Sequence, residues 1–419
     1  MNKRIIYIII FILLVIAFSV MIYFVFIADL IGPGDDTNAN QNTNTQNVNG
    51  LPVTNGAVTN TNRVNVNQTN SGGFIISNTV NQVNISNTAS GGSTVSNLVL
   101  EGSVNGVSSA PNGDGVRVYN LEEGKFFRID DNGNVIPLSE NVFPQVEDVV
   151  WSPANNKAIM TYPDGSQIMY DFDSQQQVTL PKEWDDIEFS STGEDIGFIN
   201  LSSNENERWL AVSNPDGSQI QLIEPVGDKA NSVDVNWSPS NQVVATYREG
   251  ASTSSQEVYL VGLNDENFKS IFTDGRGFEG KWSPSGDQML YSIYNAGTRY
   301  NPTLYLVDAS GDNIGTNQMS LGLQTWSDKC TFSSSSPALY CAVPQLLPAG
   351  AGLDPSVAEY SNDSIYKINT NTGDRELIAL PVFLNEENDY NISSLFLNGS
   401  ETELYFTNSL NDRLYKINL

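Results

Sequence analysis

Acidic side chains recur at a fixed distance ahead of repeated aromatic residues, and they are the residues of this sequence best suited to chemistry. A carboxylate stands three positions before each of four successive aromatic residues, and a fifth stands four positions before the next one. The five are Asp148, Asp186, Asp234, Glu279 and Asp328. Glu147 and Asp185 add charge beside the first two. If equal offsets place these groups on one ring, they would raise one another's pKa or hold a hard cation.

The residue types leave three interpretations of these carboxylates open. The first is a site for a cation or cationic ligand, with Ca²⁺ as the natural metal and Asp148, Asp186, Asp234 and Glu279 as its ligands. In the second, each acid accepts backbone N–H groups at the start of its own strand and has only a structural role. In the third, two of them act as acid and base or nucleophile in a glycan hydrolase or lyase.

The composition excludes several other kinds of chemistry. The 419 residues contain no histidine, which excludes Ser-His-Asp and Cys-His nucleophile systems and zinc sites with histidine ligands. There are 48 acidic and 20 basic residues, for a formal net charge of -28. Because such a surface repels phosphate backbones, we expect no nucleic-acid partner.

The two cysteines flank a predicted hairpin. Cys330 and Cys341 are centred on the turn at residues 333–338, so they should face each other across the two strands. An exported domain lies in an oxidising compartment, so we expect the pair to form a disulfide, with a free buried pair as the alternative. The spacing is not Cys-x-x-Cys, so we expect a structural bond and no redox catalysis.

Internal repeats organise the C-terminal three quarters of the chain. The motif Trp-Ser-Pro occurs three times and related segments fill the gaps between its copies. The seven anchors of the repeat stand at 107, 151, 189, 237, 282, 332 and 397. A period of this length is typical of the blades of a β-propeller, and seven anchors predict seven blades, with six or eight as alternatives.

The end of the chain leaves the last predicted blade one strand short. Segments such as 258–261, 304–307, 365–369 and 414–418 resemble third strands, and the chain ends directly after the last of these. An open sheet edge invites aggregation. We therefore predict that residues 94–100 supply the missing outer strand and close the ring.

The Trp-Ser-Pro anchors, the Asp-Gly turns and the Leu-Tyr-x-Val/Ile strands resemble the WD-repeat-like repeats of TolB and of the dipeptidyl peptidase IV propeller. The resemblance covers roughly residues 102–419. It implies a β-propeller but no particular activity, since such repeats occur both in binding scaffolds and beside enzyme domains. The separate N-terminal α/β domain of TolB and the hydrolase domain of the peptidase have no counterpart here.

The N-terminal region predicts an anchor and a tether. Residues 5–27 form an uncharged run of 23 mostly apolar residues, long enough to cross a bilayer as a helix. The alternative is a cleaved signal peptide, but the run is longer than the usual apolar region of such peptides and no Ala-x-Ala site follows it. Lys3 and Arg4 precede it and acidic residues follow it, which predicts a cytoplasmic N-terminus at 1–4 and export of the rest. Residues 37–97 contain 17 Asn and 10 Thr and too few large apolar groups for a core, so 28–93 is predicted to be a flexible linker and 94–419 the propeller.

Together these features predict a single-pass membrane protein whose all-β ectodomain is a binding scaffold of the cell envelope and not an enzyme. Its expected partner is an envelope or extracellular protein or glycan. Besides the acidic ring, the insertion Ala349–Glu359 is a candidate recognition loop. Trp184, Trp209 and Trp326 lie outside the anchor position and are candidates for surface contacts.

Overall fold

The computed structural model describes residues 84–113, 115–264, 269–384 and 389–419. The predicted cytoplasmic N-terminus, the transmembrane helix and the linker up to residue 83 lie outside the described residues. The described residues all belong to one compact unit, Thr79–Leu419. Among them, no helix is both long and apolar enough to cross a membrane.

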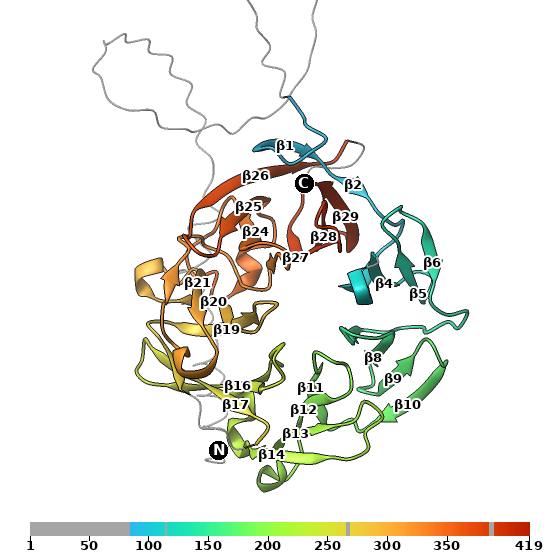
Figure 1. Ribbon diagram of the computed structural model, residues 1–419, viewed down its shortest axis with the longest axis vertical. Coiled ribbons are helices and arrows are strands. Elements are labelled where there is room, and N and C mark those ends of the chain that lie inside the picture. The colour runs from blue at the N-terminus through green and yellow to red at the C-terminus, as the bar shows by residue number, and fades with distance from the viewer. Residues whose placement is uncertain (1–83, 114, 265–268, 385–388) are drawn as a thin grey trace, which may run out of the picture. The chain divides into compact units, whose positions relative to one another are not determined.

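The described chain is built almost entirely of β-strands, which form seven sheets arranged as a ring (Figure 1). We call the axis of this ring, which the inner strands face, the channel. Six of the sheets have four strands and one has five. Each sheet is an antiparallel meander whose first strand lines the channel, apart from the two short strands that precede the first repeat. The chain is therefore a seven-bladed β-propeller, as the anchor count predicted, and the alternatives of six or eight blades are wrong.

The strands of the first four blades follow the chain from the channel outwards. Blade 1 contains β3 (Val104–Ser109), β4 (Val116–Asn120), β5 (Lys125–Ile129) and β6 (Val135–Pro137). Blade 2 contains β7 (Asp148–Trp151), β8 (Lys157–Thr161), β9 (Gln167–Asp171) and β10 (Gln176–Leu180). Blade 3 contains β11 (Trp184–Phe189), β12 (Ile196–Asn200), β13 (Trp209–Ser213) and β14 (Gln221–Pro225). Blade 4 contains β15 (Val233–Val235), β16 (Val243–Gly250), β17 (Gln256–Gly262) and β18 (Ser270–Thr273).

The last three blades follow the same order. Blade 5 contains β19 (Arg276–Trp282), β20 (Gln288–Tyr294), β21 (Thr303–Asp308) and β22 (Met319–Ser320). Blade 6 contains β23 (Cys330–Phe332), β24 (Ala338–Pro344), β25 (Asp363–Asn369) and β26 (Arg375–Val382), with β1 (Gly92–Val95) outside β26. Blade 7 contains β27 (Ile392–Leu397), β28 (Glu403–Asn408), β29 (Arg413–Asn418) and β2 (Asn97–Leu98). Short 3-10 turns are η3 (Pro111–Gly113), η4 (Glu205–Glu207), η5 (Gly227–Ser232), η6 (Ala296–Thr298), η7 (Gly311–Asn313) and η8 (Pro355–Ala358).

The predicted anchors lie in or directly after the innermost strands, where they fill the space between blades. Trp151, Trp237 and Trp282 are all more than nine-tenths buried, each in an apolar cluster of its own. The side chains of β17 alternate between buried and partly exposed along the strand, which is the pattern of a sheet covered by a neighbouring blade. The repeated tryptophans are thus core residues.

Two strands that precede the first repeat close the ring. β2 pairs antiparallel with β29, Asn97 opposite Lys416 and Leu98 opposite Tyr415, and so supplies the missing outer strand of blade 7. The predicted closure is confirmed in this respect. The structure adds a contact that the prediction lacks, because β1 pairs parallel with β26 of blade 6. Isolated bridges at Ser86 and Thr88 show that contacts with the propeller begin before the predicted boundary at residue 94.

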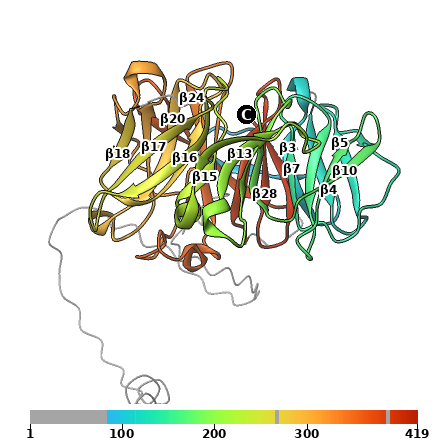
Figure 2. The same ribbon diagram turned by 90° about the horizontal axis from the view of Figure 1, so that it is seen from below.

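The segment between β24 and β25 lies on one face of the ring. We call the channel end at which the inner strands begin the mouth. The second strand of a blade runs back toward the mouth, so the segment between β24 and β25 lies on the mouth face. Figure 2 shows this segment, in orange-red, protruding from one face of the ring.

Candidate functional site

The predicted carboxylates lie at the mouth, at the beginnings of five successive inner strands. Asp148 is the first residue of β7, Asp186 and Asp234 lie in β11 and β15, Glu279 lies in β19, and Asp328 precedes β23 by two positions. Four of them act on one another electrostatically: Asp186 with Asp234, and Glu279 with both Asp234 and Asp328. Asp148 is exposed and is not among the main charges acting on Asp186. The structure therefore brings four of the five together.

The pKa values of Asp186, Asp234, Glu279 and Asp328 are all raised. Loss of bulk water around the carboxylate raises the pKa of Asp186 to about 6, with smaller contributions from Asp234 and Asp185. The same desolvation, together with the charge of Asp328, raises the pKa of Glu279 to about 7. Desolvation also raises the pKa of Asp328, against the opposing charge of Lys281. A cation that comes close to such a carboxylate stabilises its ionised form.

One cation of the chain, Arg248, lies among Asp186, Asp234 and Glu279. The guanidinium of Arg248, near the end of β16, is 2.9 Å from Oδ1 of Asp234 and also donates to the carbonyl oxygens of Asn231 and Phe278. Its charge lowers the pKa of Asp186, Asp234 and Glu279, which opposes the effect of desolvation. Arg248 thus lowers the pKa of carboxyl groups in three blades.

Asp186 has a structural role as well, because it bridges two blades. Its φ of 50° places it in the left-handed region at a β-bulge of β11, where the register shifts between Asp185 and Glu188. The bulge turns its carboxylate toward the next blade, where Oδ2 accepts the N–H of Val235. The expectation that each acid binds backbone at its own strand start is wrong for Asp186, because adjacent inner strands are near enough to be bridged.

A second tier of polar side chains lies one layer deeper than the mouth, directly before the anchors. Oε2 of Glu188 accepts the N–H of Trp237 at 2.7 Å, and Nδ2 of Asn236 donates to the carbonyl of Gly280 at 2.8 Å. Nζ of Lys281 donates to the carbonyl of Cys330. Each member ties its own inner strand to that of the following blade. Sequence reasoning missed this tier, although alternation along a strand puts a residue two positions after each acid on the same face.

A cavity of about 530 Å³ lies beside both tiers. Its lining residues are Val150, Asp186, Ile187, Glu188, Val235, Asn236, Trp237, Gly280, Lys281 and Trp282. Desolvation raises the pKa of Glu188 to about 8 and lowers the pKa of Lys281. The cavity therefore holds a carboxyl group and an amine that both favour the uncharged form more than they would in water.

The carboxylates do not form a ready-made metal site. Within the part of the chain that the structure describes, no three Asp, Glu or Cys side chains are placed to hold one ion. The ring geometry spreads the acids over separate blades, and Arg248 lies between them. The assignment of Asp148, Asp186, Asp234 and Glu279 to Ca²⁺ stays a prediction, and such an ion would need water or ligand oxygens to complete its shell.

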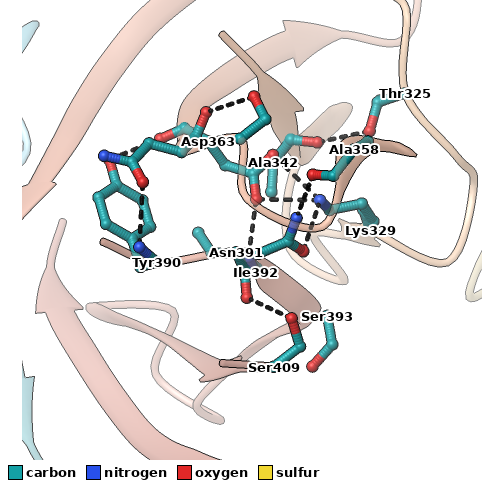
Figure 3. A network of polar contacts seen from close by, with 12 residues as sticks. Thr325, Lys329, Ala342, Ala358, Asp363, Tyr390, Asn391, Ile392, Ser393 and Ser409 are labelled. Carbon is teal, nitrogen blue, oxygen red and sulfur yellow. Dashed lines mark hydrogen bonds and ion pairs between the residues drawn. The ribbon is translucent and has the colours of Figure 1, made fainter. Parts of the chain in front are cut away.

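A buried polar network lies next to Asp328, in blades 6 and 7 (Figure 3). Nζ of Lys329 is 2.9 Å from Oδ2 of Asp363, and both side chains are almost fully buried. The same Oδ2 accepts the N–H of Ile392 at 2.7 Å. Asn391 connects this pair to the mouth-face segment, because its Oδ1 accepts from Lys329 and its Nδ2 donates to the carbonyl of Ala358. A buried ion pair satisfied in this way holds three strands in one arrangement.

Cys330 and Cys341 are directly opposite each other in the β23–β24 pair and form a disulfide, as predicted.

Of the three tryptophans outside the anchors, Trp184 does not lie on the surface, so that prediction is wrong. Its side chain is buried and stacks on Phe198 with ring centroids 3.6 Å apart. Trp209 and Trp326 are partly exposed.

The chain is similar to known proteins in its fold. No family model and no curated protein matches the chain. An oligogalacturonate lyase in complex with manganese is similar in structure with a TM-score of 0.51 and 11% identity, over 79% of this chain and 94% of that one. The likeness is one of fold. The β-propeller domain of Cps50 (Swd1) from Myceliophteria thermophila has the same TM-score and identity, over 77% of this chain and 99% of that one. The predicted resemblance to WD-repeat-like propellers is thus confirmed at the level of the fold.

Proposed function

We propose that the protein is a membrane-anchored binding module of the cell envelope, whose propeller holds a cationic group at the mouth of its channel. The group is a metal ion such as Ca²⁺ or a basic side chain of a protein partner. The anchor is residues 5–27, and the propeller faces outward, away from the cytoplasm.

The observation that carries the proposal is the environment of Arg248. Its guanidinium pairs with Asp234 and lowers the pKa of Asp186 and Glu279. The mouth therefore already accommodates one cation of the chain itself. Desolvation raises the pKa of Glu279 and of Asp328, and the charge of Asp328 raises that of Glu279 further, so a cation that binds beside them would stabilise their ionised forms. A rigid ring of blades suits this task because the acids are positioned before the ligand arrives.

The proposal is tested by titrating the propeller, residues 79–419, with Ca²⁺ and with a penta-arginine peptide in a calorimeter at low salt. The double variant Glu279→Gln, Asp328→Asn should weaken binding of at least one probe about tenfold or more, since 1.4 kcal/mol corresponds to that factor. The charge-matched control is Glu140→Gln, Glu194→Gln, two exposed acids distant in sequence from Glu279 and Asp328.

Two outcomes would count against a binding mouth. If neither probe binds the wild-type propeller, the mouth does not bind cations. If the control variant weakens binding as much as the mouth variant, the attraction comes from the overall charge and no site is involved.

The second candidate function is a carboxylate-dependent glycan-processing enzyme. It is favoured by one observation: Asp186 and Glu279 face one mouth with pKa values of about 6 and about 7, so near neutral pH they differ in protonation. The fold neighbour that is a lyase adds no argument at 11% identity. Release of new saccharide ends from envelope glycans by the wild-type propeller, and its loss in Glu279→Gln, would replace the binding proposal by this one.

A further inference from the structure

The segment between β24 and β25 presents large apolar side chains to solvent. Leu346 is 72% exposed, Leu353 62%, Val357 45% and Tyr360 81%. Three of them, Leu346, Val357 and Tyr360, line one hollow of about 340 Å³. We call these four residues the mouth-face patch. Such a group of exposed apolar side chains on one segment is typical of an interaction surface, whereas single exposed leucines are ordinary.

The backbone beneath the patch is firmly held. The N–H groups of Gly350 and Gly352 donate to the carbonyls of Arg299 and Tyr300 in blade 5, at 2.9 and 2.8 Å. The N–H of Gln345 donates to the carbonyl of Asn362 at 2.8 Å, which joins the two ends of the segment, and Asn391 of blade 7 donates to the carbonyl of Ala358. Gly352 packs so closely on Tyr294 that a Cβ atom would lie 2.5 Å from its ring. The segment is therefore anchored to neighbouring structure on both sides.

The residues that face inward are the small ones. Ala351 and Ala358 are fully or almost fully buried, and the carbonyl of Ala358 accepts from Nδ2 of Asn391. A segment selected only for folding would bury its leucines and expose its alanines, because burial of a leucine contributes about 1.5 to 3 kcal/mol. The opposite arrangement here leaves Leu353 and Tyr360 without a folding role.

The blade 5 loop that supports the segment is strained. Arg299 and Tyr300 are consecutive non-glycine residues with φ of 57° and 59°, a conformation unfavourable for side chains with a Cβ. The capping box between Asn295 and Thr298 and the two hydrogen bonds to Gly350 and Gly352 maintain it. These contacts hold the loop in this conformation, and the loop in turn fixes the position of the patch.

Charge around the patch selects the kind of occupant. Asp354, Glu359 and Asp389 are exposed on the segment or at the edge of the hollow, and Arg299 is the basic residue of the supporting loop. The acidic border repels anionic lipid surfaces, and the formal charge of -28 opposes a second copy of this chain. A segment with apolar side chains flanked by Lys or Arg satisfies both the apolar patch and its border.

We propose that the mouth-face patch is the docking surface for an amphipathic, basic segment of a partner protein. Leu346, Val357 and Tyr360 receive its apolar side chains, and Asp354 and Glu359 pair with its cations. The proposal goes beyond cation binding at the mouth, because it rests on apolar contacts of a different segment. The link through Asn391 to Lys329 nevertheless puts the two surfaces side by side.

The test uses three labelled peptides of equal length and measures fluorescence anisotropy with the propeller, residues 79–419. One peptide combines Lys and Leu at helical spacing, the second keeps Lys and replaces Leu by Ser, and the third keeps Leu and replaces Lys by Glu. We expect the Lys-Leu peptide to bind at least tenfold more tightly than either of the others. The variant Leu346→Ser, Tyr360→Ser, which changes two exposed side chains that line the hollow, should reduce its affinity at least tenfold.

The control is Leu222→Ser, Phe272→Ser, which removes two exposed apolar side chains of β14 and β18 and should leave binding unchanged. Equal binding of the Lys-Ser peptide would overturn the proposal in favour of charge alone. Self-association that is lost in the patch variant, as measured by sedimentation, would identify a second copy as the occupant. Binding of anionic vesicles through the patch would identify a lipid surface. The mouth variant Glu279→Gln, Asp328→Asn distinguishes this surface from the mouth, because it should retain most Lys-Leu binding.

Discussion

At the residue scale, desolvation favours the protonated form of the Glu188 carboxyl group. Glu188 accepts a backbone N–H from Trp237, yet desolvation raises its pKa from 4.5 to about 8, helped by the charge of Asp186. The folded state therefore binds a proton that the unfolded state releases. This contribution to stability is complete below pH 4.5 and is lost as the pH rises toward 8.

The first prediction concerns this pH dependence. The contribution of Glu188 to the free energy of unfolding should fall by about 2 kcal/mol as the pH rises from about 6 to about 8, because a slope of up to 1.4 kcal/mol per pH unit applies between the two pKa values of this group. Glu188→Gln, which keeps an acceptor for Trp237, should flatten the dependence. Urea unfolding at both pH values measures it.

Glu194→Gln is the matched control, since Glu194 is exposed and belongs to neither tier. A residual slope is expected in Glu188→Gln, because the pKa values of Asp186 and Glu279 are also raised. Identical slopes in wild type and Glu188→Gln would mean that Glu188 is ionised in the folded state.

At the element scale, closure of the ring depends on strands that are distant in sequence. β2 covers the edge of β29, and β1 covers β26 of the preceding blade. Thr94 is completely buried and Leu98 packs against the core shared by blades 6 and 7. The two strands thus tie the beginning of the propeller to two blades at its end.

The second prediction compares chains that begin at residues 79, 97 and 102. The chain from 97 loses β1 and should melt below the chain from 79. The chain from 102 loses both strands, and its melting temperature should be lower by ~10 °C or more, since 1 kcal/mol corresponds to a few degrees in a domain of this size. Calorimetry on the three chains measures this, and three equal melting temperatures would contradict closure by β1 and β2.

The repeat pattern predicts most of these elements correctly. The third strands expected at 258–261, 304–307, 365–369 and 414–418 lie in β17, β21, β25 and β29. Residues 97–98 also lie at the predicted edge. The pairing of Gly92–Val95 with β26 could not be predicted, because parallel pairing of remote segments leaves no local period and is decided by the blade edge that is available.

At the scale of the whole molecule, charge and apolar character are divided along the chain. Residues 1–100 contain three basic and three acidic residues, so residues 101–419 carry the entire formal net charge of -28. The uncharged run at 5–27 precedes them. An acidic propeller behind an apolar segment should stay in solution near the membrane without lying on anionic lipid.

The third prediction tests this organisation. The full chain should remain with the membrane fraction after an alkaline carbonate wash, while a chain lacking residues 5–27 should be released. Protease added to the outside of intact cells should degrade the propeller of the full chain. Protection from protease would place the propeller in the cytoplasm, and release of the full chain by carbonate would exclude a spanning anchor.

The sequence by itself determined the features that repeat or depend on neighbours along the chain. Seven anchors predicted seven blades, and two cysteines centred on one turn predicted the disulfide. Both follow from periods and spacings that are visible in one dimension.

Only the tertiary structure decided what the acidic residues do. It placed Arg248, from a different strand, among Asp186, Asp234 and Glu279, and it turned Glu188 and Lys281 toward the following blades. It also put the large side chains of the mouth-face patch outside and the alanines inside. These outcomes depend on which blades become neighbours and on where burial removes water, and neither is a property of local sequence.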